Sequence, residues 1–275
     1  MNRRGLKEAS RQCIRDAQSS TKLVTLCFLL SVYIVIAADW GLGTLVQSFS
    51  SKGHYLSQAI SAETKSYILV FLISFVCQFV LVFLAAGYAS FSLKLSRGKP
   101  FSKRVLTEGF QIWGKCVLLY LMISLLLSLW SSIFSMPISY LLSALFLAGS
   151  IGEDAMFWGL LGYMALVMLI VSYRYRTAWF VLLDQPELSV RQVLNQAKAI
   201  NRIHRWKLFL LDLSFLPWLL LGVLTLGILF IWKLPYITAT YAHAYNFMLE
   251  DYAKRQQHLQ ELLEAQRNRM EQHRF

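Results

Sequence analysis

The sequence predicts an all-α protein, a polytopic bundle of six transmembrane helices. Of its 275 residues, 56% are hydrophobic and 15% are charged, which leaves more apolar surface than one soluble core of this size can bury. In addition, 24 of the 27 lysine and arginine residues fall into four segments that alternate with long uncharged runs. Because the cytoplasmic loops of membrane proteins are enriched in lysine and arginine, this alternation predicts which segments face the cytoplasm.

The composition also excludes several classes of protein. The net charge of +12 comes from basic residues dispersed at the ends of apolar runs, whereas nucleic-acid binding needs them gathered on one face. The four cysteines show no CxxC spacing and the five histidines are scattered along the chain. We therefore expect no disulfide framework, no metal site and no cofactor. The expected partner is the lipid bilayer, not nucleic acid.

The first two spans follow a cytoplasmic N-terminal segment, residues 1–22. An uncharged stretch that ends before Asp39 predicts a short first span over residues 23–40, with Trp40 as its interfacial aromatic anchor. A run of 28 uncharged residues then predicts a second span over residues 67–91. This run exceeds the ~20 residues that a crossing needs, and small residues near its end favour close helix packing.

The third uncharged run, residues 116–152, is too long for one crossing and barely allows two. Pro137 divides it into a third span over residues 116–136 and a remainder, 137–152. If the remainder also crossed, the span predicted over residues 155–173 would carry seven basic residues to the outer face, against the orientation rule. We therefore expect residues 137–152 to form a re-entrant or outer-surface helix, and 155–173 to be the fourth span.

A helical hairpin supplies the fifth and sixth spans, over residues 207–224 and 227–249. Its tip is expected between Leu220 and Gly227, and Pro217 is expected to kink its first arm. The polar segment 251–275 then follows as a cytoplasmic tail, whose spacing of opposite charges favours a solvated helix over a coiled-coil dimer.

An amphipathic helix is predicted over residues 188–204, in the cytoplasmic loop before the hairpin. Ser189 is a good N-cap with Gln192 three residues later, and the apolar residues that follow have helical spacing. This helix either packs under the bundle as a connector or contacts anionic lipid headgroups or a partner at the inner face. The residues available for the second role are Arg191, Lys198, Arg202 and Arg205.

Asp212 is the main candidate for a functional residue, because a carboxylate inside a membrane span is costly unless it is paired. Its candidate partners are polar residues of the sixth span: Lys233, Tyr236, Thr240 and His243. A hairpin turn at Gly222 would set Asp212 level with Lys233, whereas a turn at Leu226 would favour Thr240 or His243. In either case we expect Asp212 mainly to lock the hairpin, with a proton or ion relay as the alternative.

The C-terminal half contains an ordered series of motifs: Leu183-Asp184-Gln185-Pro186, Trp206-Lys207-Leu208-Phe209, Asp212-Leu213-Ser214-Phe215 and Trp232-Lys233-Leu234-Pro235-Tyr236. With these motifs, the stretch from Tyr173 to Glu250 resembles the uncharacterised bacterial integral-membrane family known as domain of unknown function 975. The front half is similar only in layout. The resemblance implies a multi-helix membrane fold and a bacterial host, and it carries over no activity, substrate or catalytic residue.

These observations favour a non-enzymatic accessory or scaffold protein of the bacterial cell envelope. No nucleophile and base, nucleotide loop or metal triad is visible in the sequence, so we expect no enzyme. The alternative is a small transporter or channel that uses Asp212 and the polar residues of the sixth span. In both cases the protein is expected in the bacterial cytoplasmic membrane with both termini in the cytoplasm. A protein partner or a second copy of the chain is compatible with either function.

Overall fold

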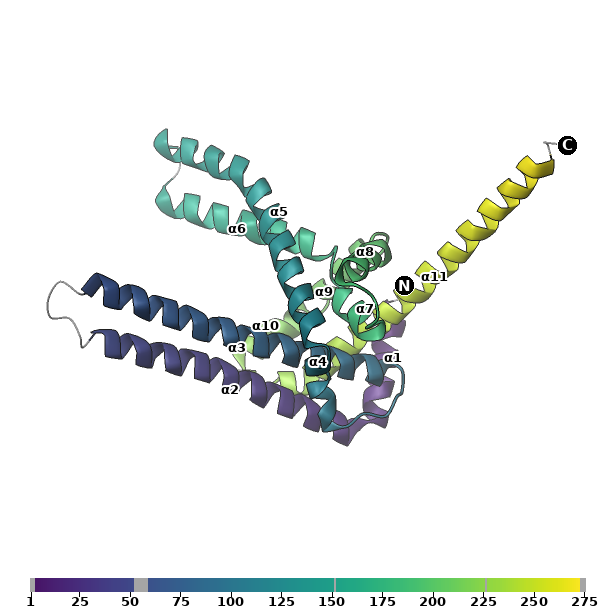
Figure 1. Cartoon of the computed structure of the whole chain (residues 1–275), viewed down its shortest axis with the longest axis horizontal. Helices are drawn as coiled ribbons and strands as arrows, with labels where there is room; N and C mark the ends of the chain where they lie inside the picture. Colours follow the sequence, from purple (N-terminus) through teal and green to yellow (C-terminus); the bar gives the residue numbers. More distant parts are fainter. Residues whose placement is uncertain (1–2, 52–58, 151, 226, 273–275) are drawn as a thin grey trace. The chain divides into compact units, whose positions relative to one another are not determined.

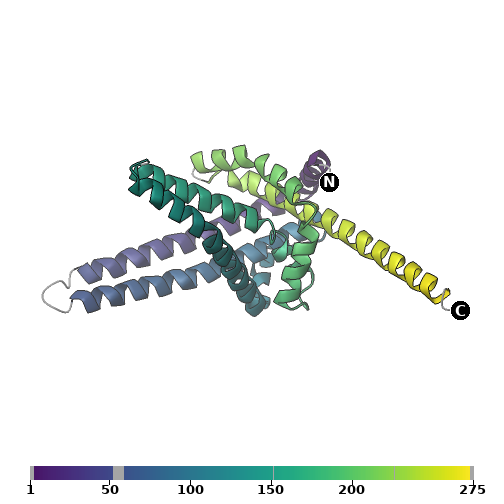
Figure 2. The same ribbon diagram turned by 90° about the horizontal axis from the view of Figure 1, so that it is seen from above.

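The computed structural model describes residues 3–51, 59–150, 152–225 and 227–272, and every regular element in these ranges is a helix. Figures 1 and 2 show the helices from two directions. The predicted all-α class is therefore confirmed for the described part of the chain, while Leu226, one of the two predicted hairpin tips, lies outside it. In chain order the elements are α1 (Arg3–Asp16), α2 (Gln18–Ser51), α3 (Ala59–Ser96), the 3-10 helix η1 (Lys103–Thr107), α4 (Glu108–Gln111), α5 (Trp113–Leu147), α6 (Glu153–Ser172), α7 (Ala178–Asp184), α8 (Val190–Asn201), α9 (Arg205–Leu213), α10 (Leu216–Leu224) and α11 (Phe230–Gln272).

Several helical segments are long and apolar enough to cross a membrane, which indicates a multi-pass membrane protein. Within the described ranges these five are Thr21–Ser48, Ser66–Ser96, Trp113–Leu147, Glu153–Ser172 and Arg205–Leu224. The sixth predicted span, residues 227–249, falls in the first part of α11 and is not among the five. Lys233 and a series of threonine, tyrosine and histidine side chains lower the hydropathy of that stretch. The five segments thus indicate a multi-pass membrane protein.

The chain divides into two compact units. The first unit contains Met1–Glu8, Leu121–Pro217 and Thr240–Phe275. The second unit contains Ala9–Tyr120 and Trp218–Ala239. Four helices, α1, α5, α10 and α11, therefore contribute residues to both units.

In the second unit, α2 and α3 run antiparallel and side by side (Figures 1 and 2). Tyr88 of α3 joins them, because its hydroxyl shares a 3.0 Å hydrogen bond with Thr25 and its ring stacks on Phe28 with centroids 4.3 Å apart. Phe91 lies in the same core and is fully buried.

The first apolar helix is longer than the sequence predicted. The end expected at Trp40 is wrong, because α2 continues to Ser51. A glycine destabilises a helix interior by only about 1 kcal/mol, so Gly41 and Gly43 can remain helical where other contacts stabilise α2. One such contact is the 2.7 Å hydrogen bond that Ser74 of α3 donates to Asp39 of α2.

Two glycines allow η1 and α4 to approach α3 closely. Gly87 of α3 lies directly against the backbone of Leu106, and a Cβ added to it would collide with the Leu106 carbonyl. Gly109 of α4 lies in the same way against the carbonyl of Phe83, 2.5 Å from the position of an added Cβ. The segment after α3 is thus packed back onto the helix that precedes it.

The hairpin turns late in the predicted interval. α10 ends at Leu224, and Gly227 has a φ of 86° in the left-handed region, where its N–H donates to the Gly222 carbonyl at 2.8 Å. Gly222 itself lies inside α10 and faces the ring of Phe230 closely, so the turn considered at Gly222 is wrong. The first arm is interrupted near Pro217, as predicted, because α9 ends at Leu213 and α10 begins at Leu216.

In the first unit, α5 and α6 run antiparallel and side by side (Figures 1 and 2). Pro137 lies inside α5, which continues to Leu147, so the predicted helix boundary at Pro137 is wrong and residues 137–147 are part of α5. A proline is tolerated in an apolar helix when the surroundings satisfy the backbone. One turn earlier, Tyr163 of α6 donates a 3.1 Å hydrogen bond to the Phe134 carbonyl and sets the register of the pair.

The structure has a helix, α8 (Val190–Asn201), within the range 188–204 where an amphipathic helix was predicted. Ser189 and Gln192 form the predicted capping box: the Gln192 N–H donates to the Ser189 hydroxyl at 3.4 Å, and the Ser189 N–H donates to the Gln192 side chain at 2.9 Å. The apolar face is buried within the protein and consists of Val190, Val193, Leu194, Ala197 and Ile200. α8 packs against α7. The apolar face of α8 is thus covered by the protein itself.

In the same unit, α11 continues as one unbroken helix to Gln272. Its side chains from Ala253 to Met270 are all exposed. Figure 1 shows this part of α11 as a single yellow helix that ends at the C-terminus.

Candidate functional site

Asp212 lies in the last turn of α9, just before the helix is interrupted. Pro217 has no N–H and cannot bond to the Leu213 carbonyl, so the helix cannot continue with regular hydrogen bonds. The backbone tightens instead, and the Phe215 N–H donates to the Asp212 carbonyl at 2.9 Å. The local sequence therefore places a carboxylate beside a break in a membrane helix.

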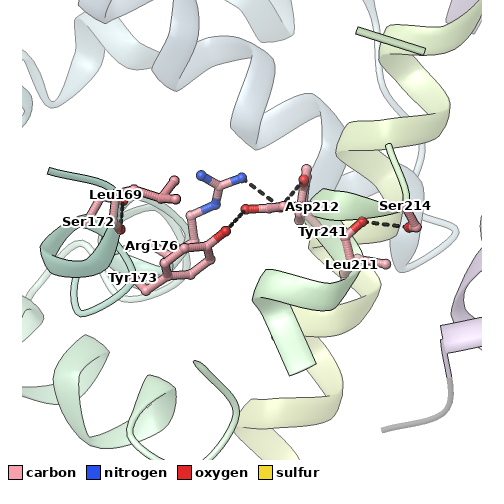
Figure 3. Close-up of polar contacts among 8 residues, drawn as sticks. All are labelled: Leu169, Ser172, Tyr173, Arg176, Leu211, Asp212, Ser214 and Tyr241. Carbon is pink, nitrogen blue, oxygen red and sulfur yellow. Dashed lines mark hydrogen bonds and ion pairs between the residues drawn. The ribbon is translucent and has the colours of Figure 1, made fainter. Parts of the chain in front are cut away.

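Three donors surround the Asp212 carboxylate (Figure 3). The Tyr173 hydroxyl donates to Oδ2 at 2.5 Å, and Nη2 of Arg176 donates to Oδ1 at 3.1 Å. The Tyr241 hydroxyl also donates to Oδ1. We call Tyr173, Arg176, Asp212 and Tyr241 the Asp212 cluster.

The rings of the two tyrosines complete the surroundings of the arginine. The Arg176 guanidinium lies 5.0 Å from the centre of the Tyr241 ring and 5.9 Å from that of Tyr173. Both distances fall within the ~6 Å range of cation–π attraction. Phe215, which is fully buried in the interrupted stretch, packs edge-on against Tyr241 with centroids 5.9 Å apart. These contacts fix the orientation of the donors around the carboxylate.

The two donors from the α6–α7 connection are held by turns and by α8. Tyr173 directly follows α6. In the turn that begins there, the Arg174 N–H donates to the Val171 carbonyl at 3.0 Å. The side-chain amide of Asn201, in the last turn of α8, donates to the Arg174 carbonyl at 3.2 Å. The capped amphipathic helix therefore helps to set the turn that carries Tyr173 and Arg176.

The charges in the cluster compensate each other. Asp212 is 21% exposed and Arg176 is 38% exposed, so the ion pair is partly shielded from water. A carboxylate in an apolar span costs several kcal/mol unless it is paired and hydrogen-bonded. Here one cation and two hydroxyl groups supply that compensation. The cluster ties together three segments of the first unit: the end of α6, α9 and α11.

The structure assigns Asp212 a partner on α11, but not one of the four that the sequence suggested. Its partner there is Tyr241, which directly follows the fully buried candidate Thr240 and precedes the half-buried candidate His243 by two residues. The other two candidates belong to the second unit and have contacts there. The Lys233 ammonium lies 3.8 Å from the centre of the Trp218 ring, and the ring of Tyr236 receives the Arg11 guanidinium at 5.6 Å.

Tyr241 could have been predicted as the partner of Asp212 from the position of the hairpin turn. Asp212 lies 12 residues before the end of α10 at Leu224, and Tyr241 lies 11 residues after the start of α11 at Phe230. A turn placed at Gly227 would therefore have set the two residues level. Tyr173 and Arg176 carry no comparable local signal.

The four residues suggested for lipid or partner contact do not share one environment. Arg191 and Arg202 are exposed on and just after α8. The Lys198 ammonium lies 5.4 Å from the centre of the Tyr175 ring. Arg205, at the start of α9, has a buried Nε with no hydrogen-bond partner among the described residues. Within the same residues, no group of three histidine, cysteine, aspartate or glutamate side chains could hold a metal ion.

A second group of polar contacts lies on α11 within the first unit. Nε2 of His204, which is buried, donates to Oδ2 of Asp251 at 2.9 Å, and Arg255 contacts the same oxygen. The hydrogen bond from His204 is the main cause that lowers the pKa of Asp251 below its ordinary value of 3.8.

This pair predicts a stability difference that depends on pH. Because the carboxyl has the lower pKa in the folded state, its stabilising contribution is complete above pH 3.8 and decreases as the pH falls through the folded-state pKa. We expect Asp251→Asn to melt below the wild type near neutral pH, and the difference to shrink below about pH 3.8. Thermal melts of both proteins in detergent, from neutral to acidic pH, measure this difference in melting temperature. A difference that grows on acidification would contradict the assignment.

Comparison with known proteins agrees with the resemblance seen in the sequence. A family model described as "Protein of unknown function (DUF975)" matches residues 1–251, so the similarity extends through the front half of the chain as well. Comparisons with curated proteins and with solved structures find no match.

Proposed function

Since the chain belongs to the DUF975 family of proteins of unknown function, whose description assigns no activity, we propose a function from the geometry of the Asp212 cluster. The protein is a non-enzymatic accessory or scaffold protein of the bacterial cell envelope, and the cluster is a structural lock of its membrane helices. The observation that carries this proposal is that Arg176 and two tyrosine hydroxyls already occupy the Asp212 carboxylate. A charge-compensated group of this kind holds helices together and leaves no free carboxylate for a substrate.

The lock predicts that Asp212 and Arg176 contribute to stability as a pair. Asp212→Asn should cost about 2 kcal/mol, because it removes the ion pair and weakens the two tyrosine hydrogen bonds. Arg176→Gln should also destabilise, and the double variant should lose less than the sum by about 1 kcal/mol. Unfolding in mixed detergent micelles measures these free energies. Arg191→Gln, which removes an exposed arginine, is the control and should change stability by less than about 0.5 kcal/mol. Additive losses would show that the two side chains are not coupled.

The topology that goes with this function has six crossings in the bacterial cytoplasmic membrane, with both termini in the cytoplasm. The partition of 24 of 27 basic residues supports it. The hydrogen bond between Tyr163 and the Phe134 carbonyl supports a crossing in which the C-terminal part of α5, including residues 137–147, lies beside α6. In this topology the first turns of α5 lie nearer the cytoplasm. The sixth crossing is the first part of α11, which returns from the turn at Gly227.

Cysteine labelling tests this topology. Single cysteines at the exposed positions Ser102, Glu187 and Asn268 should resist an impermeant thiol reagent added to intact cells, in a background without the native cysteines. A cysteine at Ser150, exposed in the turn after α5, is the matched control and should be labelled from outside. Glu187 is preferable to Ser189, whose hydroxyl caps α8. Labelling of Asn268 from outside would reduce the number of crossings to five.

One observation favours a second candidate, a small transporter or channel. Broken membrane helices with a charged residue at the break are typical of transporter binding sites, and α9 is interrupted directly after Asp212. In this alternative Asp212 would exchange its bond to Arg176 for a proton or ion during transport. The two functions therefore predict different proton fluxes across the membrane.

A further inference from the structure

A pocket of about 300 Å³ opens in the first unit where α6 ends and α9 begins. Its walls are mainly apolar or aromatic and come from these two helices. The lining residues are Leu166, Leu169, Ile170, Tyr173, Arg205, Trp206 and Phe209. Ile170 is 61% exposed and Trp206 is 71% exposed, so the pocket has an open apolar side.

Arg205 is the charged residue that lines this pocket. The Tyr173 hydroxyl is already bonded to Asp212. Nε of Arg205, by contrast, is buried and has no hydrogen-bond partner among the described residues. An unsatisfied buried donor costs about 1–3 kcal/mol, and a guanidinium is satisfied best by a carboxylate or phosphate. The chemistry of Arg205 therefore suits an anionic group at this end of the pocket.

The position of the pocket identifies the source of that anion. It lies at the junction of Ser172 and Arg205, which end and begin two of the helices that are long and apolar enough to cross a membrane. In the proposed topology both residues are at the cytoplasmic interface, where phosphate headgroups meet acyl chains. An interfacial tryptophan and an arginine beside an apolar groove fit a molecule that is anionic at one end and apolar at the other.

We propose that this pocket binds one anionic phospholipid, with its phosphate on Arg205. The acyl chain lies along the apolar wall formed by Leu166, Leu169 and Ile170, and Trp206 covers the glycerol region. This site rests on the proposed topology. It gives the scaffold a defined lipid partner at the inner leaflet, between the end of α6 and the start of α9.

Native mass spectrometry of the full-length protein tests the site. The protein is released from micelles that contain equal amounts of phosphatidylglycerol and phosphatidylcholine. It should retain one phosphatidylglycerol molecule in preference to phosphatidylcholine. Arg205→Gln should lower this retention about tenfold, the equivalent of a lost charge-assisted hydrogen bond. Arg191→Gln changes the charge equally at an exposed position outside the pocket and should retain the lipid. Equal retention in wild type and Arg205→Gln would overturn the proposal.

Two further comparisons distinguish the lipid site from a free-anion site and from a folding defect. Inorganic phosphate at the same concentration should not displace the lipid, because it lacks the acyl chain, and displacement would show a free-anion site instead. If Arg205→Gln does not fold, the competition between the two lipids in the wild type still decides: equal retention of both contradicts the proposal. The wild type could retain both lipids equally while a cysteine at Glu187 stays inaccessible from outside. This combination would refute the lipid site and leave the proposed function standing. Labelling of Glu187 from outside would refute the topology itself.

Discussion

Replacing Val193 by aspartate is expected to destabilise the protein by about 4 kcal/mol or more, the largest effect of any single change considered. Val193 is fully buried in the centre of the apolar face of α8, so the new carboxylate would be buried without a partner. The effect should reach the Asp212 cluster, because Asn201 of the same helix holds the Arg174 carbonyl. Thermal unfolding in detergent, together with the amount of protein in the membrane, measures the loss.

Asn195→Asp is the matched control for this experiment. It adds the same charge to the same helix, but Asn195 is exposed. Its effect should stay within about 0.5 kcal/mol. If Val193→Asp unfolds at the same temperature as Asn195→Asp, α8 does not pack through this face and its burial is misassigned.

Replacing Gly87 by alanine should produce the second largest loss, about 3 kcal/mol. The added methyl group would meet the carbonyl and backbone carbons of Leu106, and backbone atoms cannot turn aside as a flexible side chain can. Relief of the collision requires that η1 moves away from α3. The free energy of unfolding in mixed micelles measures this cost.

The same substitution at Gly162 should have the opposite sign. Gly162 lies in α6 with no other atom within 4 Å of an added Cβ. Alanine is the better helix former by up to about 1 kcal/mol, so Gly162→Ala should be neutral or stabilising. Equal losses at Gly87 and Gly162 would show that the cost comes from glycine replacement in general and not from the approach of η1.

The parts of the fold that could be predicted are those with local causes. The start of α8 followed from a capping box of two residues and from apolar spacing within one helix. The helical class and the apolar segments followed from long uncharged runs. The boundary at Pro137 failed because the proline rule reflects water-soluble helices, whereas the continuous apolar sequence on both sides favours a helix in lipid.

The candidate site could be predicted only in part, for a physical reason. Asp212 stood out because a carboxylate in an apolar run needs compensation, and a helical hairpin limits its partners on the next helix to a few positions. Tyr173 and Arg176 precede it by 39 and 36 residues. They reach Asp212 through turns whose path is fixed partly by the Asn201 amide, and no periodicity in the sequence encodes that path.

Proton flux measured beside stability decides most directly whether the Asp212 cluster is a lock. Wild type and Asp212→Asn are reconstituted in proteoliposomes with a pH-sensitive dye, and samples of the same preparations are unfolded. A lock predicts flux no greater than in protein-free liposomes for either protein, together with a loss of about 2 kcal/mol in the variant. Proton flux that is present in the wild type and absent in an equally stable Asp212→Asn would contradict the lock and establish a transporter.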